Sequence, residues 1–174
     1  MPLAELENLA RIGKLKAEPP ATSELEGLLR SGTMRLADAR RAELNPESCF
    51  DLAFNAAHAF SLAALRWHGH RSENRFLVFQ TLTNTLELPT AQWRVLDDAH
   101  RKRNAAEYEG DVEVDDALLA ALLRVTIEVG RSRCAHCWAR RQRNTGAIRR
   151  LIERTNIDTL PPWDGNPSFS FGSS

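Results

Sequence analysis

Apolar residues recur every three or four positions through most of the chain, which is the period of amphipathic helices. This spacing predicts helices over residues 3–15, 23–44, 46–67, 72–88 and 91–109, and from about 116 to 129 with a continuation toward 143. The stretch 46–67 is apolar on more than one side, so we expect it at the centre of a bundle. The pattern therefore predicts an all-α fold.

Local signals mark several ends of these helices. Ser23 followed by Glu26 has the spacing of a capping box, and Asn45 and Ser72 are further candidate N-caps. Gly110 is placed to end the helix 91–109 in the left-handed conformation. The alternating segment 111–114 would be a single strand with no partner, so we interpret it as a loop.

The composition fits one packed domain with extensions, since the chain has 174 residues, of which 43% are hydrophobic and 26% charged. We expect the domain core over residues 45–130, with the helices of residues 1–44 packed on it. A basic helical extension over 131–155 and a flexible, proline-containing tail over 156–174 would follow.

The sequence predicts neither a membrane span nor export. Its richest apolar stretch, residues 50–67, is interrupted by polar side chains and falls short of the roughly 20 apolar residues that cross a bilayer. The first residues do not have the basic and then apolar pattern of a secretory signal, and three cysteines cannot close a disulfide framework. We therefore expect a cytoplasmic protein with no membrane partner.

The formal net charge of zero is the sum of unlike parts. Residues 1–130 carry 15 basic and 20 acidic side chains, whereas residues 131–154 carry eight arginines and one glutamate. This strongly basic segment could contact an anionic partner such as RNA, or the acidic surface of the same chain or of another protein. Its candidate phosphate-binding residues are Arg131, Arg133, Arg140 and Arg141.

One segment, residues 100–110, is dense in side chains that support chemistry. His100, Asn104 and Tyr108 are spaced by four, so they share one face of the predicted helix, with Arg103 about 100° away from Asn104. These polar residues could form an ordinary solvated face, or they could form a site. Arg101 and Lys102 leave the same two alternatives open, a solvated face or a phosphate track.

The sequence Arg103-Asn104, then three residues and the aromatic Tyr108, resembles the signature of the HEPN superfamily, which is Arg, a polar residue, three variable residues and His. The surroundings at 56–69 and 74–80 also look like bacterial HEPN-type proteins, and the resemblance covers roughly residues 45–130. It implies an up-and-down four-helix bundle, usually a homodimer in which the motif helices face each other across a cleft. Many members are metal-independent endoribonucleases of toxin–antitoxin or anti-phage systems, and others are inactive partners of nucleotidyltransferases or bind RNA without cutting it.

The resemblance assigns Arg103 to charge stabilisation at the scissile phosphate, with Asn104 at the polar position and Tyr108 where the family has histidine. A phenol, with its ordinary pKa near 10, is at an apparent disadvantage of about 4 kcal/mol as a base at pH 7. Tyr108 can donate a proton or bind phosphate, but it cannot simply replace the histidine. His100, two turns earlier on the same face, and His58, midway along the central helix, are the candidate substitutes, although a lone histidine on such a helix is more often a packed core or boundary residue than a catalyst.

Cys134 and Cys137 have the two-residue gap of a zinc half-site or a redox pair, although they could also be simple helix cysteines. A structural zinc needs four ligands, and the sequence offers no second Cys/His pair downstream, so we expect no metal and no cofactor.

Two functions stay open. One is a HEPN-like protein that binds or cleaves RNA, with a cognate antitoxin as its partner. The other is a non-catalytic dimeric module that partners an enzyme, for example a nucleotidyltransferase, or a regulator.

Overall fold

The computed structural model describes residues 2–41, 43–110 and 113–132. Within them it contains seven helices and one pair of two-residue strands. In chain order these are α1 (Pro2–Arg11), β1 (Lys16–Ala17), α2 (Thr22–Ala39), α3 (Pro46–Trp67), β2 (His70–Arg71), α4 (Arg75–Gln80), α5 (Leu82–Thr85), α6 (Thr90–Glu109) and α7 (Asp116–Ser132). The predicted all-α fold is confirmed. None of the helices in this part of the chain has both the length and the apolar content needed to span a bilayer.

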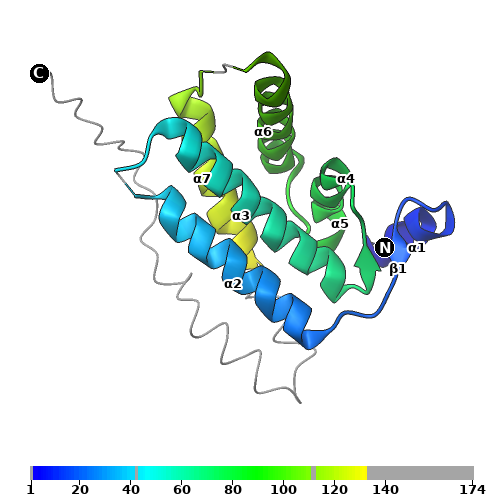
Figure 1. The fold of residues 1–174 in the computed structure, drawn as a ribbon. Helices are drawn as coiled ribbons and strands as arrows, with labels where there is room; N and C mark the ends of the chain where they lie inside the picture. The colour runs from blue at the N-terminus through cyan, green and yellow to red at the C-terminus, as the bar shows by residue number, and fades with distance from the viewer. Residues whose placement is uncertain (1, 42, 111–112, 133–174) are drawn as a thin grey trace, which may run out of the picture.

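Helix α3 lies at the centre of the fold, as its apolar sequence predicts. It contacts α2, α4, α5, α6, α7 and β2. Figure 1 shows α2 and α3 running antiparallel, α7 passing behind α3 in this view, and α6 antiparallel to α7. The apolar stripe of α3 is fully or almost fully buried, at Phe50, Ala53, Phe54, Ala57 and Phe60. A bundle of this kind places the polar side chains of α6 close to one flank of α3.

The α2–α3 crossing depends on a glycine. A Cβ atom at Gly32 would lie 2.4 Å from Cε1 of Phe60, whose side chain is completely buried. At Gly27, one and a half turns earlier on α2, nothing lies within 4 Å of the corresponding position. The absence of a side chain at Gly32 therefore lets the two helices approach closely, as small residues do at tight crossings.

Two of the predicted helix ends are confirmed. The side-chain oxygen of Asn45 accepts a hydrogen bond from the Ser48 N–H at 2.8 Å, which caps α3. Gly110 ends α6 with φ of 77°, in the left-handed region that glycine enters without a steric penalty.

The predicted start of α2 is wrong. The N-cap is Ala21, without a side-chain hydrogen bond, so Ser23 lies inside the first turn, and the helix ends at Ala39 rather than near Leu44. The preceding linker is fixed from outside the helix, because the carbonyl oxygens of Glu18 and Pro19 accept hydrogen bonds from a side chain of α3. The contact between the linker and α3 thus sets where α2 begins, and the local sequence signals place that start two residues later.

The predicted helix 72–88 is interrupted. Asn74, not Ser72, caps α4 by accepting from the Leu77 N–H at 3.1 Å, while the Ser72 hydroxyl accepts from the Asn74 N–H. The break comes at Thr81, whose buried hydroxyl donates to the carbonyl of Val78 at 2.8 Å. Threonine hydroxyls that bond back to the preceding turn compete with the helix ladder and disturb it, which explains the division into α4 and α5.

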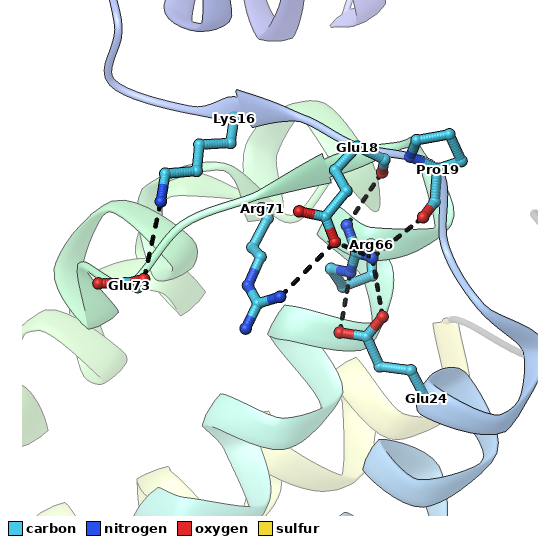
Figure 2. Close-up of polar contacts among 7 residues, drawn as sticks. All are labelled: Lys16, Glu18, Pro19, Glu24, Arg66, Arg71 and Glu73. Atoms are coloured by element: carbon cyan, nitrogen blue, oxygen red, sulfur yellow. Dashed lines mark hydrogen bonds and ion pairs between the residues drawn. The ribbon is translucent and has the colours of Figure 1, made fainter.

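The fold also contains a strand pair and a buried ion-pair cluster that the sequence did not predict. Lys16 pairs with Arg71 and Ala17 with His70, antiparallel. Next to this pair lies Arg66 of α3, whose side chain is only 1% exposed. Figure 2 shows how the linker between β1 and α2 wraps around its guanidinium.

Arg66 donates hydrogen bonds from all three nitrogens of its guanidinium group. It donates to the two carboxylate oxygens of Glu24 at 3.0 and 2.7 Å, and to the carboxylate of Glu18 at 3.2 Å. Its remaining hydrogen bonds go to the carbonyls of Glu18 at 3.0 Å and Pro19 at 3.2 Å. The hydrogen bond from Arg66 lowers the pKa of Glu24 below its usual value. This cluster fastens α2 and its linker to the end of α3 (Figure 2).

Candidate functional site

The site is built on α6, which begins directly after Pro89 and buries Leu96 and Ala99 against the core. Burial of these two residues turns the segment 100–104 toward α3 and α4. Two of the residues that the sequence singled out on α6, His100 and Arg103, therefore lie against the neighbouring helices, whereas the others have different environments.

Arg103 bridges α6 and α3. Its side chain is 23% exposed, and its guanidinium carbon lies 5.2 Å from the ring centroid of Phe54, at cation–π distance. Its Nε is 3.4 Å from a carboxylate oxygen of Asp51, and its Nη2 is 3.5 Å from one of Glu107. Both ion pairs are long and partly solvated, so each is weak, and together they hold the guanidinium beside α3 and give it two carboxylate partners within the chain.

His100 lies on the same phenylalanine. Its ring stacks on Phe54 at a centroid distance of 6.2 Å and an angle of 17°, and Phe76 of α4 lies 6.0 Å away. Asn104 Nδ2 donates to His100 Nε2 at 3.2 Å, which confirms that these two residues share one face of α6. Since an amide nitrogen only donates, Nε2 is the acceptor and the neutral ring carries its proton on Nδ1. That Nδ1 is buried and has no hydrogen-bond partner among the described residues.

His58 of α3 completes the cluster. Its ring meets the edge of Phe79 at 5.9 Å, and Phe79 in turn contacts Phe54 at 5.4 Å. Burial, followed by the positive charges of Arg75, Arg103 and Arg35, lowers the pKa of His58 to about 4. Burial also lowers the pKa of His100; Asp97 opposes this effect, and Arg103 and Arg75 add to it. Both imidazoles are therefore neutral at pH 7 and lie in positive surroundings.

Tyr108 lies outside this cluster, because its side chain is 89% exposed at the end of α6.

The predicted phosphate-binding residues that the structure describes differ in what they contact. Arg101 forms an ion pair with Asp97 one turn earlier, whereas Lys102 lines a pocket beside Arg103. Arg131 is half-buried in the last turn of α7.

Several predicted residues lie outside the described part of the chain. They are Arg133, Arg140 and Arg141 of the basic segment and the pair Cys134 and Cys137. In the part that is described, no group of three or more His, Cys, Asp or Glu residues is arranged to hold a metal ion.

A pocket of about 240 Å³ opens between the start of α3 and the end of α6. It is lined by Glu47, Phe50, Asp51, Lys102, Arg103, Ala106, Gly110 and Val114. Phe50, Ala106 and Val114 supply apolar surface, two carboxylates come from α3, and two cations come from α6. Arg103 belongs both to this pocket and to the aromatic and histidine cluster.

Sequence reasoning missed two residues of this region. Asp51 is the second of the two carboxylates on the largely apolar α3, one turn after Glu47, and this placement could have marked it. Arg75 acts on both histidines and has a buried Nη1 with no hydrogen-bond partner among the described residues. No local signal indicates this, because Arg75 reaches the site only through the packing of α4 against α3 and α6.

No family model matches the chain, and neither a curated protein nor a solved structure matches it.

Proposed function

We propose that the chain is a HEPN-like RNA-binding protein that holds a phosphate of the RNA backbone at Arg103 and Lys102. One observation carries this proposal. His100 and Arg103 both lie on Phe54, and His58 adjoins the same aromatic group through Phe79. An imidazole is thus close to the motif arginine even though Tyr108 occupies the position where the family has histidine.

The electrostatics of the cluster favour an anionic ligand. His58 and His100 are held neutral by burial and by the nearby guanidinium groups, so the positive charges of these arginines are not offset by the imidazoles and favour a negatively charged ligand. Arg75 Nη1 and His100 Nδ1 are donors without a hydrogen-bond partner among the described residues. An unmatched buried donor costs about 1–3 kcal/mol, and a phosphate oxygen is an acceptor that could satisfy it after a side-chain movement.

The same groups support metal-independent cleavage. A neutral imidazole of His100 would take the proton of the ribose 2′-hydroxyl at Nε2, after Asn104 gives up its hydrogen bond to that atom, as the 2′-oxygen forms a bond to phosphorus. Arg103 would stabilise the charge on the phosphoryl oxygens, and the bond from phosphorus to the 5′-oxygen would then break. The Tyr108 hydroxyl, exposed at the end of α6, would have to be reached by that leaving oxygen in order to give it a proton. The products would be a 2′,3′-cyclic phosphate and a 5′-hydroxyl.

Incubation of the full chain with single-stranded RNA in EDTA tests the cleavage step. We expect 2′,3′-cyclic phosphate ends from the wild type and their loss in Arg103→Ala and His100→Ala. The matched control is Arg94→Ala, because Arg94 is an exposed arginine of the same helix. Intact RNA in EDTA, or equal cleavage by Arg103→Ala, would remove the nuclease from the proposal and leave RNA binding to be measured separately.

A second candidate function is a non-catalytic interaction module that forms a homodimer or partners an enzyme. The ion pairs of Arg103 with Asp51 and Glu107 favour it, because they neutralise the guanidinium within the chain. The exposed Tyr108 also favours it, since tyrosine is a frequent anchor residue of interfaces. A stoichiometric partner on co-purification, together with no RNA binding at low salt, would select this function over the first.

A further inference from the structure

The pocket at the start of α3 contains the proposed phosphate-binding residues Lys102 and Arg103 and, beside them, two carboxylates and apolar surface. We propose that it binds the base of a guanosine in single-stranded RNA, next to the phosphate held by Lys102 and Arg103. This inference rests on the proposed RNA binding, and it adds a base preference that phosphate contacts alone cannot provide.

The size and lining of the pocket suit one planar ring system. Its volume of about 240 Å³ lies below the roughly 300–1,000 Å³ typical of sites for drug-sized ligands. Phe50, Ala106 and Val114 give it apolar walls that can contact the faces of a base. Gly110, in its left-handed conformation, adds a wall without a side chain.

The carboxylates define which base edge fits. Glu47 and Asp51 are one helical turn apart on α3, so both present oxygen acceptors to the same pocket. Guanine carries two adjacent donors on its Watson–Crick edge, N1–H and the 2-amino group, which match the two oxygens of one carboxylate. Adenine and cytosine each present an amino group beside an acceptor nitrogen, and uracil presents one N–H between two carbonyls. These three bases would therefore bring acceptors toward a carboxylate.

The two cations of the pocket come from α6, whereas its two carboxylates come from α3. Lys102 and Arg103 can therefore contact a phosphate while α3 contacts the base, which is the division between positioning and readout seen in nucleic-acid sites. Arg103 Nε lies 3.4 Å from a carboxylate oxygen of Asp51, so this ion pair joins the cations of α6 to the carboxylates of α3. Loss of the Asp51 charge should therefore abolish base preference and, by releasing Arg103, keep or increase the affinity for phosphate.

Fluorescence anisotropy with labelled oligouridylates tests the inference, using one central guanosine, inosine or adenosine. Inosine is the decisive comparison, because it differs from guanosine only in lacking the 2-amino group. We expect the wild type to bind the guanosine oligomer about tenfold more tightly than the inosine oligomer, since inosine cannot form one of the two hydrogen bonds to the carboxylate. Asp51→Asn and Glu47→Gln should reduce the ratio toward one, with Asp98→Asn as the control at an exposed acid of α6.

Equal affinity of the wild type for the guanosine and inosine oligomers would overturn the inference, and so would a preference that survives both carboxylate substitutions. If the oligomers bind equally but Arg103→Ala weakens them all, the proposed RNA binding stands and the guanine pocket fails. If none of the oligomers binds, both proposals fail. The fold of each variant is checked by far-UV circular dichroism and thermal unfolding, so a loss of preference in an unfolded variant is not counted as support.

Discussion

At the scale of single residues, His58 is the group whose environment departs most from that of a free side chain. It is half-buried in α3, and the charged or titratable groups that act on it are Arg75, Arg103, Arg35 and His100. These come from α2, α4 and α6, so the tertiary fold, not the local sequence, holds the imidazole neutral. A neutral histidine in positive surroundings makes the folded state sensitive to acid.

We predict that acidification destabilises the chain partly through His58. Its folded pKa of about 4 is below the ordinary 6.5, so between these values the unfolded state binds the proton more readily. The contribution of neutral His58 to the free energy of unfolding is therefore intact above pH 6.5 and is lost as the pH falls to about 4. Urea unfolding at pH 7.5 and 4.5 should show wild type losing about 2 kcal/mol more than His58→Phe. An equal loss in both proteins would contradict this assignment.

Arg66 is the second residue with a large expected effect. Its guanidinium is buried and joins Glu24, Glu18 and the carbonyl of Pro19. Arg66→Met would leave these acceptors without their donor, and we expect the free energy of unfolding to fall by about 3 kcal/mol. Arg71→Met is the matched control, because Arg71 is 47% exposed and contacts Glu18 at 3.6 Å. We expect Arg71→Met to lower the free energy of unfolding by less than about 1 kcal/mol. Similar losses in the two variants would show that the contacts of Arg66 are not what holds the linker and α2 to α3.

At the scale of elements, the α2–α3 crossing is the most extensive packing contact of the fold, and Gly32 sets how closely the helices approach. Phe60 fills the space that a side chain at Gly32 would need. Because Phe60 is completely buried, its ring can move only by displacing other core side chains.

Gly32→Ala should therefore lower the free energy of unfolding by about 1–3 kcal/mol, as overpacking of a core does. Gly27→Ala is its control on the same helix, because nothing lies within 4 Å of the added methyl group. That variant should be neutral or more stable by up to about 1 kcal/mol, since alanine favours the helix over glycine. Chemical denaturation measures both, and equal effects at the two positions would contradict the packing account.

The elements show where sequence patterns were sufficient. Asn45 and Gly110 were predicted because a cap and a left-handed terminus depend on residues within one turn. The β1–β2 pair was not predicted, since Lys16 and Arg71 are far apart in sequence and each strand has only two residues. The start of α2 was misplaced for a related reason, because contacts with Arg66 fix the preceding linker.

The candidate site divides in the same way. The pairing of His100 with Asn104 follows from a spacing of four, so it could be read from the sequence. The approach of His58 to this pair, and the contact of Arg103 with Asp51, depend on how α3 and α6 pack together. Helical periodicity shows which side chains share a face, but it does not show which face of another helix they meet.

At the scale of the whole molecule, the formal net charge of zero does not describe the local charge at the candidate site. The described core is acidic in sum, yet the α3–α4–α6 junction gathers Arg75, Arg103 and two neutral histidines. The binding of an RNA phosphate at this junction is the central claim, and it should depend on salt because counterions are released when phosphates are neutralised.

The most direct measurement is the affinity for a labelled single-stranded RNA at low salt, by fluorescence anisotropy, for the wild type, Arg103→Ala and Arg94→Ala. The account predicts that Arg103→Ala weakens binding about tenfold or more, since a charge-assisted hydrogen bond is worth about 1.5–3 kcal/mol. Arg94→Ala, at an exposed arginine of α6, should change the affinity only slightly. No binding by the wild type, or wild-type affinity in a folded Arg103→Ala variant, would contradict the central claim.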